Sequence, residues 1–194
     1  MNIQNDKALD IALGISRKTK TWKNRTMQWS ELLDRLAKVT RTPETVAEYK
    51  AMSRDKQSEL KDVGGFVGGH LRGGVRNAAS VTARSLITLD MDDCTETAPL
   101  MVDVTLAGTA YVMYSTHKHT TEKPRLRLVL PLSREVTPEE ETRLRALAKE
   151  YIPRRVAQLA PLVGVTPTGV KITSARKRFG SCSGRNSLCF SWRL

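Results

Sequence analysis

The sequence predicts an α+β fold, in which short strands alternate with helices. Three observations predict it. Apolar runs rich in β-branched residues recur through the middle of the chain and are bounded by turn residues, as strands are. Helix-start signals lie on both sides of these runs. The chain has 194 residues, 40% hydrophobic and 27% charged, which is typical of a folded protein with one sizeable core or two small ones.

The first 28 residues carry a basic cluster around a tryptophan, with no acidic residue inside the cluster. Basic groups around an exposed aromatic side chain suit a nucleic-acid backbone with a stacked base. A solvated arm is the structural alternative. The candidate nucleic-acid-binding residues of this cluster are Arg17, Lys18, Lys20, Trp22, Lys23 and Arg25.

Two helices are expected next, both as scaffold. Ser30 is a suitable N-cap for the first, and the apolar residues after it have helical spacing. Thr42 and Pro43 open the second, because a capping threonine precedes a proline at the first helical position. The following segment, 63–74, holds six of the twelve glycines. Such density predicts tight turns or close backbone approach, and no Lys-Ser or Lys-Thr follows to make it an ATPase P-loop.

The predicted site is built around a strand at residues 85–93. Its apolar run ends in three carboxylates. Because side chains alternate across a strand, Asp90 and Asp92 point to one side and Asp93 to the other, which makes Asp93 the weaker candidate. Two like charges so close repel each other unless a hard cation or a base lies between them. A divalent metal site at Asp90 and Asp92 is therefore expected.

Two further strands are expected to end beside these aspartates. The first runs into Ser115 and His117, which alternation places on one side, and the second places Arg125 and Arg127 on one face. Phosphoryl or nucleotidyl transfer needs metal ions to bridge the phosphates and cationic donors to take up their charge. The three strand ends supply these groups, with Ser115 and His117 bonding phosphate oxygens and an arginine neutralising them. The two strands span residues 110–114 and 125–131.

The C-terminal part begins with a capping box at Thr137 and Glu140. The helix that follows is expected to bury an apolar stripe, and strands are expected at 170–173 and near the C-terminus. No acidic residue follows Glu150, whereas eight Lys or Arg do. A basic loop between these strands adds three candidate nucleic-acid-binding residues, Arg176, Lys177 and Arg178. The apolar stripe comprises Leu144, Leu147, Ala148, Tyr151, Val156 and Leu159.

Charge and cysteine usage restrict the classes of function. The net charge of +12 and the pI near 10.0 favour a polyanionic partner, with a solvated basic surface as the alternative. Three cysteines without C-x-x-C spacing indicate neither a disulfide framework nor a zinc ribbon. No apolar run approaches the roughly 18 residues that span a bilayer, and the start of the chain lacks the apolar core of a secretion signal. A cytoplasmic protein without membrane contact is expected.

The segment Leu89-Asp90-Met91-Asp92, followed by Ser115-Thr116-His117, resembles the first two motifs of the archaeo-eukaryotic primase superfamily, an hhhDhD strand and then S-x-H. Segments 61–69, 114–120 and 122–127 are similar to those of the primase-polymerase domains of phage and mobile-element replication proteins. This resemblance covers about residues 15–145. It implies an RRM-like core, with a small antiparallel or mixed sheet flanked by helices. The implied catalytic residues are Asp90, Asp92 and His117, with Mg²⁺ or Mn²⁺ on the two aspartates and with Ser115, His117, Arg125 and Arg127 on the nucleotide.

The C-terminal segment resembles a different family. Segments 151–156, 172–183 and 191–194 are similar to the part of YgjP-type metal-dependent hydrolases that precedes their zinc-binding H-E-x-x-H helix. The primase superfamily completes its metal site with a third carboxylate on a later strand, whereas this chain has no aspartate after Asp103. The two resemblances together imply a truncated or fused protein, in which a β-containing segment is appended to a primase-like domain.

Three functions are predicted. The first is a primase-polymerase-like nucleotidyltransferase domain for DNA replication, weakly active or inactive without its third carboxylate. Its predicted partners are nucleoside triphosphates and single-stranded template or primer-template DNA, with a replicative helicase as a further candidate. The second is a basic nucleic-acid-binding protein without catalysis, and the third is a truncated zinc-dependent hydrolase. The expected units are a helical N-terminal part (1–60), a partial catalytic core (61–135) and a helix with a β segment (136–194).

Overall fold

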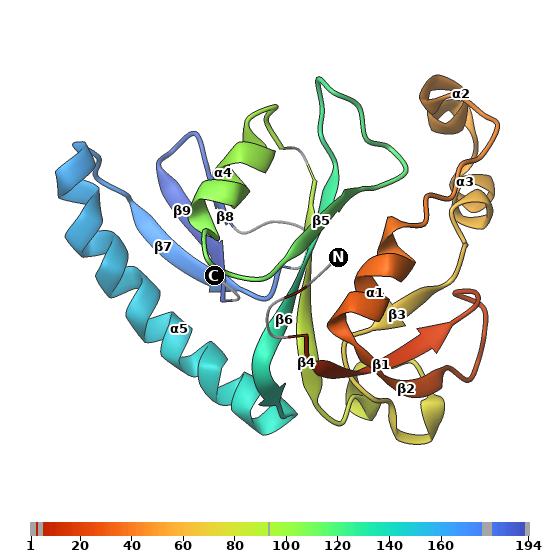
Figure 1. Ribbon diagram of the computed structural model, residues 1–194. Coiled ribbons are helices and arrows are strands. Elements are labelled where there is room, and N and C mark those ends of the chain that lie inside the picture. The colour runs from red at the N-terminus through yellow and green to blue at the C-terminus, as the bar shows by residue number, and fades with distance from the viewer. Residues whose placement is uncertain (1–2, 4–5, 93, 176–179, 193–194) are drawn as a thin grey trace.

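The computed structural model describes residues 3, 6–92, 94–175 and 180–192 and confirms the α+β class. Within this part of the chain, helices flank three small three-stranded sheets (Figure 1). The elements are β1 (Ala8–Gly14), β2 (Lys23–Gln28), α1 (Trp29–Ala37), α2 (Val46–Ala51), α3 (Arg54–Leu60), β3 (Gly65–Val67), β4 (Arg84–Met91), α4 (Ala98–Thr105), β5 (Val112–Ser115), β6 (Leu126–Val136), α5 (Pro138–Leu159), β7 (Gly169–Thr173), β8 (Gly180–Cys182) and β9 (Ser187–Ser191). The strand orders are β2-β1-β3, β4-β6-β5 and β7-β9-β8.

The first sheet carries the basic N-terminal cluster on its edge strand β2 and on the turn that precedes it, so the cluster is part of the folded protein and its charged side chains are exposed. Leu9 and Ile11 alternate along β1 and are fully buried. They pack against Trp29 and Leu32 of α1. β2 and β3 pair antiparallel with the two edges of β1. The apolar alternation of β1 thus gives the segment a core of its own, and the basic residues lie on the turn after β1 and on β2.

Both early helices begin at residues other than those predicted. α1 begins at Trp29, directly after its N-cap residue Gln28. The backbone N–H of Gln28 donates a hydrogen bond to the Glu31 carboxylate at 2.9 Å. Ser30 instead donates its hydroxyl hydrogen to Asp6 at 2.6 Å. α2 begins behind Thr45, which forms a reciprocal capping box with Glu48. Thr45, which has Glu48 three residues later, is a better N-cap than the predicted Thr42, because the Thr–Glu pair satisfies two backbone donors at once.

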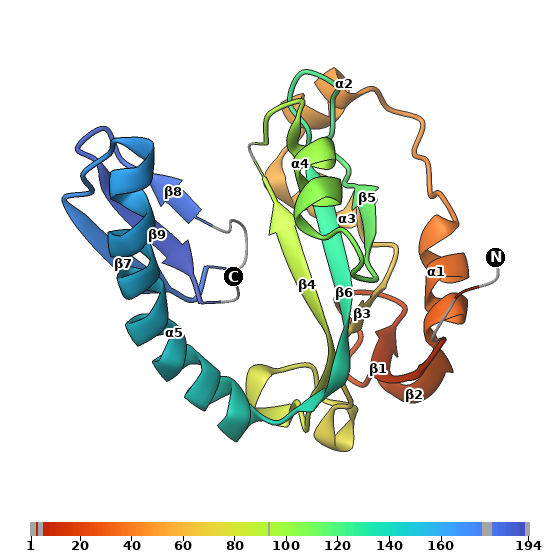
Figure 2. The same cartoon turned by 60° about the vertical axis from the view of Figure 1, so that its left-hand side comes forward.

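The central sheet, β4-β6-β5, is antiparallel and is covered on both faces. Leu89 and Leu128 point to α4, where they pack with Val102. Leu86 and Val129 point to the opposite face and pack against β1 and α1. Figure 1 shows β4 and β6 between α4 on one side and α1 on the other, and Figure 2 shows the length of these two strands. The covering on the α1 side involves the Leu86 end of β4, whereas the aspartate end of the strand faces a cleft.

The glycine-rich segment provides close backbone approach, as predicted. A Cβ atom on Gly68 would lie 2.4 Å from Cδ1 of Leu86, and one on Gly69 would lie 1.8 Å from the carbonyl oxygen of Ala83. Gly64 has a φ of +83°, which L-residues with side chains rarely adopt. Gly68 and Gly69 therefore let the chain after β3 lie directly against the start of β4, whereas Gly64 lies against the end of β1.

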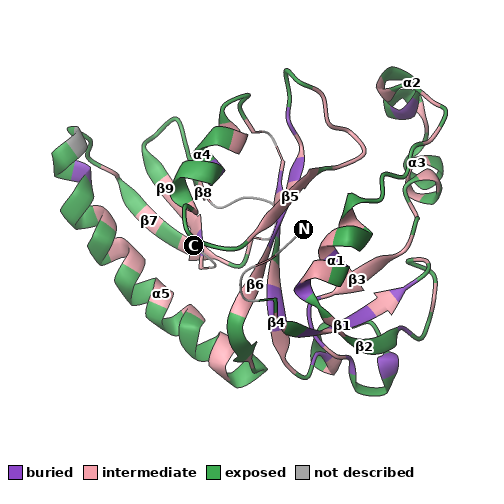
Figure 3. Cartoon of the chain, in the orientation of Figure 1, coloured by how far each residue is buried: buried purple, intermediate pink, exposed green. Residues whose placement is uncertain are grey.

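The long helix α5 begins at the predicted capping box of Thr137 and Glu140, but only Ala148 and Val156 of the predicted apolar stripe lie on its less exposed face. Leu144, Leu147 and Tyr151 are 46%, 60% and 63% exposed, so their predicted burial is wrong. Figure 3 shows exposed and intermediate residues along the helix. The less exposed positions, Arg145, Ala148, Ile152 and Val156, have the 3–4 residue spacing of one helical face. The helix contacts β7 of the C-terminal sheet.

The C-terminal sheet is mixed, because β7 runs parallel and β8 antiparallel to β9. The two predicted strands correspond to β7 and β9, and Arg145 of α5 lies over the ring of Trp192 at 5.4 Å. No helix in the described part of the chain combines the length and the apolar character needed to cross a membrane.

Candidate functional site

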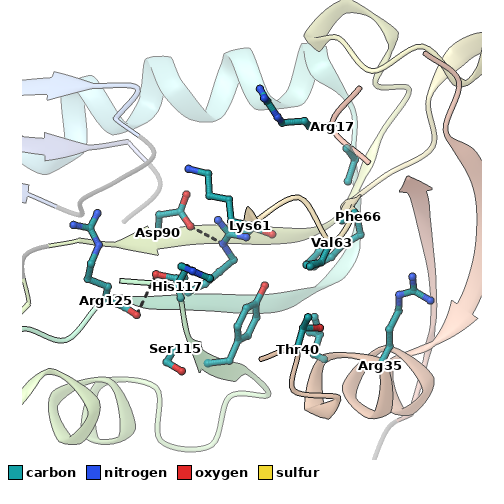
Figure 4. A pocket seen from close by; sticks show the side chains of 18 of the residues that line it. Arg17, Arg35, Thr40, Lys61, Val63, Phe66, Asp90, Ser115, His117 and Arg125 are labelled. Carbon is teal, nitrogen blue, oxygen red and sulfur yellow. Dashed lines mark hydrogen bonds and ion pairs between the residues drawn. The ribbon is translucent and has the colours of Figure 1, made fainter. Parts of the chain in front are cut away.

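The aspartate end of the central sheet opens into a cleft of 1720 Å³. Its walls are the β4-β6-β5 face, the segment around α2, and the glycine-rich segment before and along β3 (Figure 4). Among the described residues, ten basic and seven acidic side chains line it, so its net charge is positive. The basic ones are Arg17, Arg35, Lys38, Arg41, Lys61, Arg76, Arg84, Lys118, Arg125 and Arg127, and the acidic ones are Glu31, Asp34, Glu44, Asp62, Asp90, Asp92 and Glu141.

The structure brings the two predicted aspartates and the two predicted arginines together as ion pairs. The β4–β6 register sets Asp90 opposite Arg127, and Nε of Arg127 donates to Oδ1 of Asp90 at 2.6 Å. Beyond the last paired residues, Nη2 of Arg125 lies 2.5 Å from Oδ1 of Asp92. The four side chains are 23–38% exposed. We call these four residues the Asp–Arg cluster. Figure 4 shows Asp90 and Arg125 of this cluster in the cleft, with a dashed line from the Asp90 carboxylate to its partner.

Tyr114, which the sequence did not single out, lies beside this cluster. The β5–β6 register sets Tyr114 opposite Arg127, so both side chains are on the Asp90 face of the sheet. Burial lowers the pKa of the Arg127 guanidinium, but its hydrogen bond to Asp90 and its interaction with Tyr114 raise the pKa further, and the net shift is upward. The guanidinium is therefore held as a cation on the cleft face.

Ser115 has a different placement from the one predicted. It pairs with Leu126, not with an arginine, and Leu126 packs toward α4. Directly opposed residues in a sheet share a face, so Ser115 points to the α4 face. Figure 4 shows its side chain directed away from Asp90. Ser115 lines the same cleft as His117, but its side chain is not on the aspartate face, because the strand continues through Ser115 before the chain turns.

His117 lies in the turn after β5 and contacts the segment around α2. Its Nε2 is 3.4 Å from Oε1 of Glu44, and its ring centroid is 4.1 Å from that of the buried Tyr49. The ammonium of Lys118 lies 5.5 Å above the Tyr49 ring. Hydrogen bonds involving Thr42 and the backbone of Glu44, together with His117, hold the pKa of the Glu44 carboxyl below its usual value. The α2 segment thus fixes the loop that carries His117.

The loop is also fixed from β6. The backbone N–H of Arg125 donates to Nδ1 of His119 at 3.2 Å, and the N–H of Thr116 donates to the carbonyl oxygen of Arg125 at 2.9 Å. His117 and Arg125 are therefore carried by neighbouring backbone segments at the same end of the sheet. In the sequence, this proximity of His117 and Arg125 was indicated only by the short segment that separates the strands predicted at 110–114 and 125–131.

Carboxylates near this end are few. Among the described residues, no group of three or more His, Cys, Asp or Glu side chains gathers in a way that could hold a metal ion. Asp93 lies outside the described residues. Two aspartates cannot form an all-protein cage for a hard cation, but Mg²⁺ is commonly bound by one or two carboxylates together with the phosphates of a nucleotide. The donor set fits a cation of that kind.

The predicted nucleic-acid-binding residues separate into groups. Trp22 is 4% exposed and packs with Leu71 and Val81, so its predicted exposure to a stacked base is wrong. Lys18 lies 3.2 Å from Glu59, and Arg17 lies 3.9 Å from Asp62. The remaining members, Lys20, Lys23 and Arg25, are exposed. Arg176, Lys177 and Arg178 lie outside the described residues.

Comparisons with known proteins gave one match. A family model described as the VapE N-terminal domain matches residues 1–157. No curated protein and no solved structure matches the chain.

Proposed function

We propose a function from the premise that the chain belongs to the VapE N-terminal domain family, which is associated with phages and mobile elements. In this proposal the cleft binds a nucleoside triphosphate together with a divalent cation, Mg²⁺ or Mn²⁺, for a primase-polymerase-like nucleotidyltransferase domain of DNA replication. Since the described residues offer the cation no group of three carboxylates or imidazoles, the domain has weak nucleotidyltransferase activity or none in this proposal.

The observation that carries this proposal is the Asp–Arg cluster at the mouth of a basic cleft. Arginine binds phosphate through two parallel hydrogen bonds, and carboxylates bind hard cations. Arg125 and Arg127 lie on the same face as Asp90 and Asp92, so a triphosphate and its cation would meet complementary groups on one surface. Few other ligands carry both charges so close together.

Each residue has a separate part in this proposal. Asp90 and Asp92 would hold the cation, which when bound supplies positive charge to the phosphates. Arg125 and Arg127 would bind phosphate oxygens, and His117 would donate a further hydrogen bond from the loop that Glu44 and Tyr49 support. Ser115 is left out, since its side chain is on the α4 face. Tyr114, which lies opposite Arg127, would orient the Arg127 guanidinium.

The test is calorimetry of ATP binding in the presence of Mg²⁺ or Mn²⁺. We expect millimolar affinity for the parent protein, because cation affinity depends on the number of charged ligands. The Asp90→Ala/Asp92→Ala variant should lose the dependence of binding on the cation. Glu96→Ala is the matched control, because Glu96 is exposed and lies shortly after β4 outside the cleft lining. Equal heats for the parent and the double variant would rule out the cation site.

A second candidate function is nucleic-acid binding without catalysis. The exposed side chains of Lys23 and Arg25 on β2, which lies at one edge of its sheet, favour it, as does the net charge of +12. In this case binding depends on phosphate neutralisation and is indifferent to Asp90 and Asp92.

A further inference from the structure

The Asp–Arg cluster has no net charge of its own. Two carboxylates and two guanidinium groups are joined by contacts of 2.6 and 2.5 Å, which are as short as charge-assisted hydrogen bonds become. Each carboxylate that would hold a cation is bonded to an arginine that would hold a phosphate. The two halves of the ligand site therefore neutralise each other within the protein.

We propose that these two ion pairs couple the binding of a triphosphate to the binding of its divalent cation, so that each binds more weakly alone than in the presence of the other. This inference rests on the proposed function and adds its regulation. A lone cation must compete with Arg125 and Arg127 for the carboxylates. A lone triphosphate must compete with Asp90 and Asp92 for the guanidinium groups.

Partial burial makes this competition matter. The four side chains are 23–38% exposed, and removing one partner from such a pair leaves the other charge poorly compensated. A cation–triphosphate complex supplies both replacements at once, because its cation binds the carboxylates while its phosphates bind the guanidinium groups. The exchange leaves no charge without a partner, which is why the complex is favoured over either component.

Tyr114 makes the exchange easier for one arginine. The β5–β6 register sets Tyr114 opposite Arg127 independently of Asp90, so the two side chains stay neighbours when the carboxylate turns to a cation. The guanidinium then remains on the cleft face, ready for a phosphate. Coupling between two ligands is reciprocal: the cation must raise the affinity for triphosphate by the same factor by which triphosphate raises the affinity for the cation.

The decisive variant is Asp90→Asn/Asp92→Asn, tested with ATP in EDTA. It removes both carboxylate charges with little change of shape and releases both arginines. We expect its cation-free ATP affinity to rise by about fivefold to tenfold over the parent, as two partly exposed ion pairs allow. At the same time the gain in affinity on adding Mg²⁺ should be lost. A site without coupling would show the second effect and not the first.

Two further measurements complete the test. Arg125→Gln/Arg127→Gln should bind Mn²⁺ alone more tightly than the parent, as measured by the free Mn²⁺ signal in electron paramagnetic resonance, while losing ATP. Glu141→Gln is the matched control: Glu141 lies in the same cleft, is 19% exposed and pairs with Arg84. Its removal changes the cleft charge by one unit without touching the Asp–Arg cluster, and cation-free ATP affinity should stay within about twofold of the parent.

The possible failures can be told apart. If the parent binds Mg²⁺–ATP but the Asp90→Asn/Asp92→Asn variant binds cation-free ATP no better than the parent, the coupling is wrong and the proposed function stands. If Glu141→Gln raises cation-free affinity as much as the double variant, the effect is general electrostatics and the coupling is again wrong. If neither the parent nor any variant binds ATP with or without a cation, the proposed function fails and the coupling with it.

Discussion

At the scale of single residues, Trp22 shows how a basic surface can be built on a buried aromatic ring. The ring packs with Ala12, Leu71 and Val81, and Arg76 lies over it at 4.8 Å. A Cβ atom on Gly14 would lie 2.2 Å from the ring, so the glycine makes room for it. Trp22 is therefore a structural residue whose neighbours in the sequence carry the charge.

Replacing Trp22 should accordingly affect stability. We expect Trp22→Ala to reduce the free energy of unfolding by about 3–5 kcal/mol, because it leaves a cavity in a closed apolar cluster. Urea unfolding followed by circular dichroism measures this. Lys23→Ala, at an exposed neighbouring position, should change the free energy by no more than about 0.5 kcal/mol. A Trp22→Ala protein with parental stability and reduced DNA affinity would instead support the stacking role.

At the scale of elements, alternation and capping chemistry predicted β4, β5 and the starts of β6 and α5 to within one or two residues, whereas β6 continues to Val136, five residues past the predicted end. They did so because these signals are local. The face that α5 buries was not predictable in this way, since Leu144 and Tyr151 form as good a stripe as Ala148 and Ile152. Which stripe is covered depends on where the β7-β9-β8 sheet docks. Likewise, no helix was predicted between the strands at 85–93 and 110–114, where α4 lies and packs its Val102 against the central sheet.

The glycine-rich segment provides a prediction at this scale. Gly69→Ala should destabilise the protein by about 1–3 kcal/mol, the typical cost of overpacking, because the new Cβ would lie 1.8 Å from a backbone carbonyl of Ala83 that cannot easily move. Gly184→Ala is the control, since nothing lies within 4 Å of its Cβ position. Thermal unfolding of both variants measures the difference. Equal midpoints would mean that the chain before β4 does not pack closely against the glycine segment.

At the scale of the whole molecule, the candidate site depends on how strands pair, and pairing is what the sequence specified least. Alternation put Asp90 and Asp92 on one face, but only the β4–β6 register sets Asp90 opposite Arg127 and makes the arginines partners of the aspartates. For the same reason, the faces of Tyr114 and Ser115 were not predictable from the sequence, because a one-residue difference in register exchanges the faces of a strand. Glu44 comes from a distant segment and had no local signal at all.

Net charge is also a property of the whole molecule, and it predicts how nucleic acid would bind. If the exposed basic residues of β2 contact a single-stranded DNA backbone, affinity should fall steeply between 50 and 200 mM salt, with a slope of about 0.7 for each phosphate neutralised. Lys23→Ala/Arg25→Ala should then reduce that slope by about 1.4. Lys171→Ala is the matched control, because Lys171 is an exposed lysine on β7, an edge strand of the distant C-terminal sheet.

Fluorescence anisotropy of a labelled oligonucleotide, repeated over a series of salt concentrations, gives these slopes. The non-catalytic function requires that Asp90→Asn/Asp92→Asn leave the slope unchanged, because the aspartates contact no phosphate in that case. If the same aspartate variant alters DNA binding only when Mg²⁺ and ATP are present, DNA and nucleotide occupy one connected surface, and the triphosphate-binding function is favoured. A slope that is the same for the parent and for Lys23→Ala/Arg25→Ala would remove β2 from the DNA-binding surface, because counterion release must follow the charges that contact the phosphates.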